Sequence, residues 1–126
     1  MGRIVTRVTI ENPLAPTKRI ETDALVDTGA FMLTLPKAWQ SRLGTLETRD
    51  LEVFTAQQDR VAAQVGGPVR IQLAGFPRIS GEVCFLDMAA GEEPEPLVGY
   101  ITLKQSQAAV DKVGHRLTHI RYMDMK

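Results

Sequence analysis

The chain has 126 residues, with 15 Lys and Arg balancing 15 Asp and Glu, so we expect a single domain, residues 1–126, with a modest core. The two signs of charge are evenly spread, which argues against binding to nucleic acid or to an anionic membrane. Cys84 is the only cysteine, so an internal disulfide is excluded. Because no apolar stretch is as long as the apolar core of a signal peptide or as a membrane span, a cytoplasmic location is expected.

Apolar and polar residues alternate at every second position over much of the chain, which predicts β-strands. The expected strands, in chain order, are residues 4–10, 19–26, 31–35, 47–55, 60–65, 69–73 and 79–86. A short helix is expected at 36–43, because Pro36 suits a first helical turn and Gly44 suits a helix end. A second short helix is expected at 100–107, and a terminal hairpin turns around 112–115. Many short strands with few helices predict a mostly β fold, a small closed antiparallel β-barrel with one or two short helices.

The segment 24–30, Ala-Leu-Val-Asp-Thr-Gly-Ala, carries one carboxylate out of an apolar run into a turn of small residues. A carboxylate placed there is expected to be partly desolvated and close to backbone N–H groups, the conditions that perturb a pKa. Asp27 is therefore the candidate catalytic residue. Two other interpretations remain open: an Asp that only caps a tight turn, and the nucleophile of a phosphotransfer site, which would need Mg²⁺ ligands and favours a parallel α/β fold.

The sequence around Asp27 resembles the active-site loop of retropepsin-like aspartic proteases, in which two hydrophobic residues precede Asp-Thr-Gly-Ala. A second segment resembles the hydrophobic-hydrophobic-Gly motif that opens a short helix in that family; it consists of Leu97, Val98 and Gly99. Residues 108–117 also resemble the hairpin that closes many bacterial members. These elements occur in the family's order and cover nearly the whole chain, which implies a closed β-barrel of the retropepsin (acid protease) type.

The resemblance implies a role for each residue of the first motif. Asp27 would be the catalytic carboxylate, Thr28 would brace the loop against a partner loop, Gly29 would allow close backbone approach, and Ala30 would be a small residue beside the substrate. Because each chain offers one such Asp, the dyad would require a homodimer that forms through the active-site face and the termini, residues 1–8 and 117–123. The expected activity is that of an aspartic endopeptidase on a peptide or protein substrate, without a cofactor or metal.

A flap that closes over the substrate is expected at 47–65. Its tip would be formed by Ala56, Gln57, Gln58 and Asp59. Family flaps often carry a glycine at the tip, and viral members commonly place an Arg of the dimer's ion-pair network where this chain has Tyr100. These departures keep two alternatives open: a catalytically weak or inactive module for peptide binding or dimerisation on the same fold, and a regulatory protease whose dimer forms only under certain conditions.

Four other side chains have candidate roles. His115 and His119 could share a metal on a helix, but on a strand this spacing covers about 13 Å, so exposed histidines are expected. Cys84, in a predicted strand, is expected to be a small buried thiol and not a nucleophile. Phe31 is expected either to pack on the helix after the Asp27 loop or to line a substrate pocket.

Overall fold

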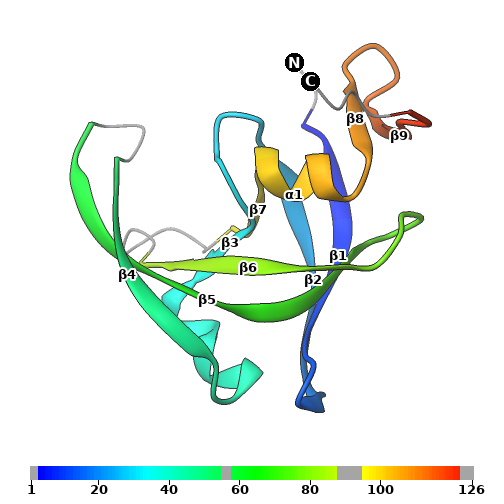
Figure 1. Ribbon diagram of the computed structural model, residues 1–126. Helices are drawn as coiled ribbons and strands as arrows, with labels where there is room; N and C mark the ends of the chain where they lie inside the picture. Colours follow the sequence, from blue (N-terminus) through cyan, green and yellow to red (C-terminus); the bar gives the residue numbers. More distant parts are fainter. Residues whose placement is uncertain (1–2, 55–57, 88–94, 123–126) are drawn as a thin grey trace.

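The computed structural model describes residues 3–54, 58–87 and 95–122, and within them the chain is built mainly of β-strands (Figure 1). The elements in chain order are β1 (Val5–Asn12), β2 (Ala15–Val26), β3 (Thr34–Pro36), the 3₁₀ helix η1 (Lys37–Leu43), β4 (Glu47–Phe54), β5 (Arg60–Leu73), β6 (Ile79–Leu86), β7 (Leu97–Val98), α1 (Tyr100–Gln105), β8 (Ala108–Asp111) and β9 (Arg116–His119). Among the described residues, no helix has the length and apolar character needed to cross a membrane.

Seven strands form one sheet in the order β1-β2-β7-β3-β6-β5-β4, and β1 also pairs with β5. Most neighbours are antiparallel, as expected, but the short pairings β2–β7 and β3–β6 are parallel. They arise because β3 and β7 insert between strands that are distant in the sequence. The mostly β fold is confirmed, whereas closure into a complete barrel stays a prediction.

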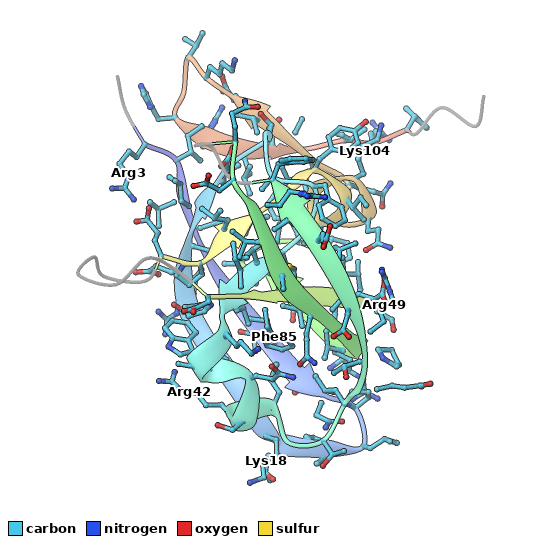
Figure 2. The ribbon with its side chains drawn as sticks, turned by 90° about the vertical axis from the view of Figure 1, so that its left-hand side faces the viewer. Arg3, Lys18, Arg42, Arg49, Phe85 and Lys104 are labelled. Carbon is cyan, nitrogen blue, oxygen red and sulfur yellow. The ribbon has the colours of Figure 1, made fainter. Side chains whose placement is uncertain are left out.

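The core is formed by apolar side chains on the buried faces of the strands, as the alternation of apolar and polar residues in the sequence predicts. Val8 and Ile10 of β1 are fully buried, and Ile10 lies opposite Ile20 of β2 and Ile71 of β5. Phe85 is also fully buried, and Figure 2 shows it inside the molecule while the labelled Arg and Lys side chains lie around the outside. A smaller apolar cluster joins the β4–β5 hairpin to β6 and to the segment before β3; it contains Met32, Ala63, Val65 and Cys84.

The predicted first residue was wrong for two strands. The second strand begins at Ala15 and not at residue 19, because β1 and β2 continue their pairing down to Asn12 opposite Ala15. Asn12 is buried and stabilises this end: its Nδ2 donates to the carbonyls of Leu43 and Thr45, and its Oδ1 accepts from the Leu14 N–H. The third strand begins at Thr34 and not at residue 31.

The two strands expected at 60–65 and 69–73 are one strand, β5. Gly66, Gly67 and Pro68 would ordinarily signal a turn. Here the register with β6 shifts between Gly66 and Val69, while Gly67 still pairs with Glu47 of β4. The strand therefore accommodates the three residues as a bulge.

Both predicted helices are present, with differences in type and length. The first is a 3₁₀ helix that starts after Pro36 and ends at Leu43; Gly44 follows it, with a φ of 71° that suits glycine. The second, α1, ends at Gln105 instead of residue 107, because Gln107 adopts a φ of 56° that ends the helix. The predicted terminal hairpin is confirmed as β8–β9, a separate two-stranded sheet.

Candidate active site

Asp27 lies directly after β2, where the backbone is held by β7. Leu25 and Val26 pair with Leu97 and Val98 in parallel register, and the Asp27 N–H donates to the Val98 carbonyl at 3.0 Å. The Asp27 carbonyl accepts from the Ala30 N–H at 3.1 Å, which closes the turn. The carboxylate Oδ1 accepts from the Gly29 N–H at 2.9 Å. The half-buried carboxylate is thus oriented by its own loop.

Gly99 brings helix α1 into direct contact with this loop. A Cβ added at Gly99 would lie 2.4 Å from the Met32 nitrogen and 2.6 Å from the Ala30 oxygen, distances that no side chain tolerates. With glycine there, the Tyr100 N–H reaches the Ala30 carbonyl and the Ile101 N–H reaches the Phe31 carbonyl, each at 2.7 Å. The two motifs of the sequence, residues 27–30 and 97–99, are therefore in contact.

Thr102 is a supporting residue that sequence reasoning missed. Its buried Oγ1 accepts from the Leu33 N–H at 2.9 Å, so it fixes the far end of the Asp27 loop to α1. This partner is 69 residues away, and a Thr in a short helix more commonly bonds to its own backbone. No local signal in the sequence indicates the contact.

A cleft of about 720 Å³ opens beside Asp27. Asp27, Gly29 and Ala30 line one side, and residues 51–54 of β4 line another. Further lining residues are Phe31, Thr34, Cys84, Leu86 and Leu97. Its walls are mainly apolar, which suits the side chains of an extended peptide. In Figure 1 the β4–β5 hairpin rises on the left, across from α1 and β7.

Comparison with known proteins bears on the fold. No protein-family model and no curated protein matches the sequence. Among solved structures, EIAV protease complexed with the inhibitor HBY-793 superposes with a TM-score of 0.59 at 22% identity, over 82% of this chain and 86% of that chain. This chain has a retropepsin-like fold.

The flap was predicted at residues 47–65, and the structure has the β4–β5 hairpin in that part of the chain. Gln58 and Asp59 lie between the paired residues Phe54 and Arg60, and Gln58 has a φ of 68°. The other two predicted tip residues, Ala56 and Gln57, lie outside the described residues. Their role in substrate binding stays a prediction.

A second carboxylate, Glu52, also lines the cleft of the retropepsin-like fold. Its side chain is 71% exposed, and its Oε2 lies 3.7 Å from Nη1 of Arg60 on the neighbouring strand. The Glu52 side chain is thus exposed and lies beside Arg60, whereas the Asp27 carboxylate is bound within its own loop. Asp27 therefore remains the candidate catalytic residue of the chain.

Three further candidate residues from the sequence, Thr28, Phe31 and Cys84, differ in their exposure and in their relation to the cleft. Thr28 is exposed on the surface of the Asp27 loop, and Phe31 lines the cleft, one of its two expected positions. Cys84 is buried at the cleft floor; this burial raises the pKa of the thiol, with the charge of Arg49 acting in the opposite direction. A thiol of this kind stays protonated at neutral pH and is a poor nucleophile.

The two histidines lie on the β8–β9 hairpin, away from the cleft lining. His115 is in the turn with a φ of 53°. His119 stacks on Phe76, with ring centroids 4.2 Å apart, and its Nε2 lies 2.8 Å from the Gly75 carbonyl. Since a carbonyl only accepts, Nε2 carries the proton. His119 thus fastens the hairpin to the β5–β6 turn, and in the described part of the chain no three His, Cys, Asp or Glu residues are grouped to hold a metal ion.

Proposed function

We propose that the protein is a homodimeric aspartic endopeptidase, with Asp27 of each copy forming one shared catalytic dyad. The observation that carries the proposal is the position of Asp27: a carboxylate oriented by the Gly29 N–H, held by the Gly99 motif, at the side of an apolar cleft in a retropepsin-like fold. Thr28, Gly29 and Ala30 are proposed to support the loop and contact the substrate, as the sequence resemblance implies.

The proposed chemistry requires two carboxyl groups that share one proton, which is the general behaviour of aspartic proteases. Because two carboxylates in contact cannot both ionise, one stays protonated and the other acts as a base. The base takes a proton from water, whose oxygen attacks the carbonyl carbon of the peptide bond, while the acid gives its proton to the carbonyl oxygen. The tetrahedral intermediate then collapses: the C–N bond breaks, the amine leaves with a proton from one carboxyl, and a hydroxyl proton of the intermediate returns to the other.

The cleft supports an extended peptide as the substrate. Leu51, Val53 and Leu86 pack on the small apolar cluster beneath the hairpin, so the cleft offers an apolar surface close to Asp27. β4 is the last strand in the sheet order, so a peptide lying along it would gain main-chain hydrogen bonds as an added strand does. We propose that the β4–β5 hairpin acts as the flap, which excludes water from the bound peptide.

The test is cleavage of a peptide library by wild type, Asp27→Asn and the control Asp23→Asn, each at several protein concentrations and from acid to neutral pH. Asp23 is on β2, the strand that leads to Asp27, and its exposed side chain lies beside Arg7, so its replacement controls for loss of one negative charge. We expect cleavage that rises faster than linearly with wild-type concentration, persists in Asp23→Asn and disappears in Asp27→Asn. If folded Asp27→Asn matches wild type, the catalytic proposal is wrong, and peptide binding without cleavage would favour the inactive binding module.

A further inference from the structure

A second hollow, of about 450 Å³, lies at the base of the β4–β5 hairpin, where β4, β5 and β6 all contribute to its lining. Its charged lining residues are Glu47, Arg49 and Glu82. Gly67 and Gly81 also line it and contribute backbone but no side chain, which leaves room for a ligand. We refer to this feature as the hairpin-base hollow; it shares no lining residue with the cleft beside Asp27.

The hairpin-base hollow opens on the same face of the sheet as the cleft. Arg49, which Figure 2 labels beside the hairpin, lies opposite Val65, and Val65 lies opposite Cys84. Residues directly opposite one another project from the same face of a sheet. Cys84 lines the cleft, whereas Arg49 and Val65 line the hollow. The hollow therefore continues the cleft toward the base of the hairpin.

Carboxylates predominate along this face. Four of the five charged residues that line the cleft and the hollow are acidic, namely Asp27, Glu47, Glu52 and Glu82, against Arg49. Arg49 lies 3.3 Å from Glu82, and Arg60 lies 3.7 Å from Glu52. Glu47 forms no ion pair with any residue that the structure describes. Since the whole chain carries no net charge, this excess of negative charge is local to the face along β4.

We propose that the hairpin-base hollow is a subsite for a basic side chain of the substrate peptide, and that Glu47 is the residue that selects it. The proposal rests on the proposed function, since the occupant is the peptide that Asp27 would cleave. A peptide added along the free edge of β4 has the same rise of about 3.4 Å per residue as β4 itself. The peptide residue opposite Glu47 is therefore four positions from the residue opposite Leu51, which lines the cleft. Because four is an even number, both peptide side chains project from the same face.

The charges around Glu47 favour Lys or Arg at this position of the peptide. A basic residue opposite Glu47 forms a cross-strand pair of opposite charge, which stabilises neighbouring strands. Its long side chain extends over β4 toward the hollow, where Glu82 is a second carboxylate. An acidic residue at the same position would lie near both carboxylates and is disfavoured. Since Glu47 is exposed, the preference should be moderate and should weaken as salt screens the charges.

The test measures, by fluorescence anisotropy, the binding of fluorescein-labelled peptides to Asp27→Asn, the variant that should hold a peptide without cleaving it. The peptides are alike except for Lys, Gln or Glu placed four residues before or four residues after a central Leu. In at least one of the two placements, we expect the Lys peptide to bind about fivefold or more tightly than the Glu peptide at about 0.05 M NaCl. The difference should fall below about twofold at about 0.5 M NaCl.

Three substitutions, each added to Asp27→Asn, assign the preference to this site. Glu47→Gln should reduce the Lys preference to below about twofold. Arg49→Gln should increase it, because Glu82 loses its cationic neighbour. The control Glu21→Gln removes an exposed carboxylate beside Arg19 on β2 and should leave the preference unchanged. Circular dichroism establishes that the variants are folded, and the opposite changes expected for Glu47→Gln and Arg49→Gln cannot both arise from a loss of folding.

The proposal is wrong if Glu peptides bind as tightly as Lys peptides, if the preference survives Glu47→Gln, or if no peptide of the series binds. Cleavage of the same peptides by wild type separates this failure from that of the proposed function. Cleavage of the Lys, Gln and Glu peptides with equal kcat/KM contradicts the subsite alone. Lys-selective binding that depends on Glu47, without cleavage by wild type, supports the subsite and contradicts the catalytic proposal.

Discussion

Gly99→Ala is the substitution that most directly tests the contact between helix α1 and the Asp27 loop. The added methyl group would lie 2.4 Å and 2.5 Å from the nitrogen and oxygen of Met32 and 2.6 Å from the oxygen of Ala30. All three atoms belong to the backbone, so no side chain can rotate away to make room. We expect α1 and the loop to move apart.

The loss of stability expected for Gly99→Ala has two sources. Overpacking in a close-packed region costs about 1–3 kcal/mol. Separation also weakens the two 2.7 Å hydrogen bonds from the N–H groups of Tyr100 and Ile101, each of which contributes about 0.5–1.5 kcal/mol. We therefore expect Gly99→Ala to lower the free energy of unfolding by about 2–6 kcal/mol, a large part of the total for a domain of this size.

The assay is urea unfolding followed by circular dichroism, with Gly75→Ala as the matched control. At Gly75 an added methyl group meets nothing within 4 Å, and only the positive φ of 87° opposes it, which costs about 1 kcal/mol. Gly99→Ala should lower the urea midpoint by about 1 M or more, and by more than the control does. A Gly99→Ala midpoint equal to that of wild type would refute the close contact and the role assigned to the second motif.

Two further predictions concern single side chains. Thr102→Val keeps the shape of the side chain but leaves the Leu33 N–H without its 2.9 Å acceptor. It should lower the free energy of unfolding in urea by about 1–3 kcal/mol, while Thr102→Ser should lower it by less. Equal losses of stability in the two variants would contradict the hydrogen-bond argument. At the β8–β9 turn, the Gly114 N–H is the main cause that lowers the pKa of Asp111, followed by Arg116 and the Val113 N–H, against an opposing effect of desolvation. Because the pKa of Asp111 is lower in the folded chain than in the unfolded chain, these interactions stabilise the fold fully above the ordinary pKa of about 3.9. The stabilisation is lost as the pH falls through the folded pKa. An NMR titration of the Asp111 carboxyl carbon with a midpoint at or above the ordinary value would contradict the lowered pKa.

The sequence was most informative where local pattern and tertiary structure agree. Alternating residues predicted most of the strands, because one face of each is buried, as Val8 and Ile10 are. Both motifs were identified from the sequence by their resemblance to a family, and the structure shows that they are in contact because Gly99 allows close backbone approach.

Other features depend on contacts that no local pattern reveals. Gly66 to Pro68 has the composition of a turn, yet pairing with β4 on one side keeps β5 continuous. The predicted strand at 31–35 was too long because the carbonyl of Phe31 accepts from α1 and the Leu33 N–H donates to Thr102. The stacking of His119 on Phe76 likewise joins residues of distant elements.

The central claim is that each active site needs Asp27 from two chains, and mixing wild type with Asp27→Asn tests it most directly. The total protein concentration is held constant while the wild-type fraction varies, subunits are allowed to exchange, and the rate of peptide cleavage is measured. If both carboxyl groups are required, the rate follows the square of the wild-type fraction, so an equal mixture has about one quarter of the wild-type rate. A rate proportional to the fraction, about one half in the equal mixture, would show that one Asp27 suffices and would contradict the shared dyad.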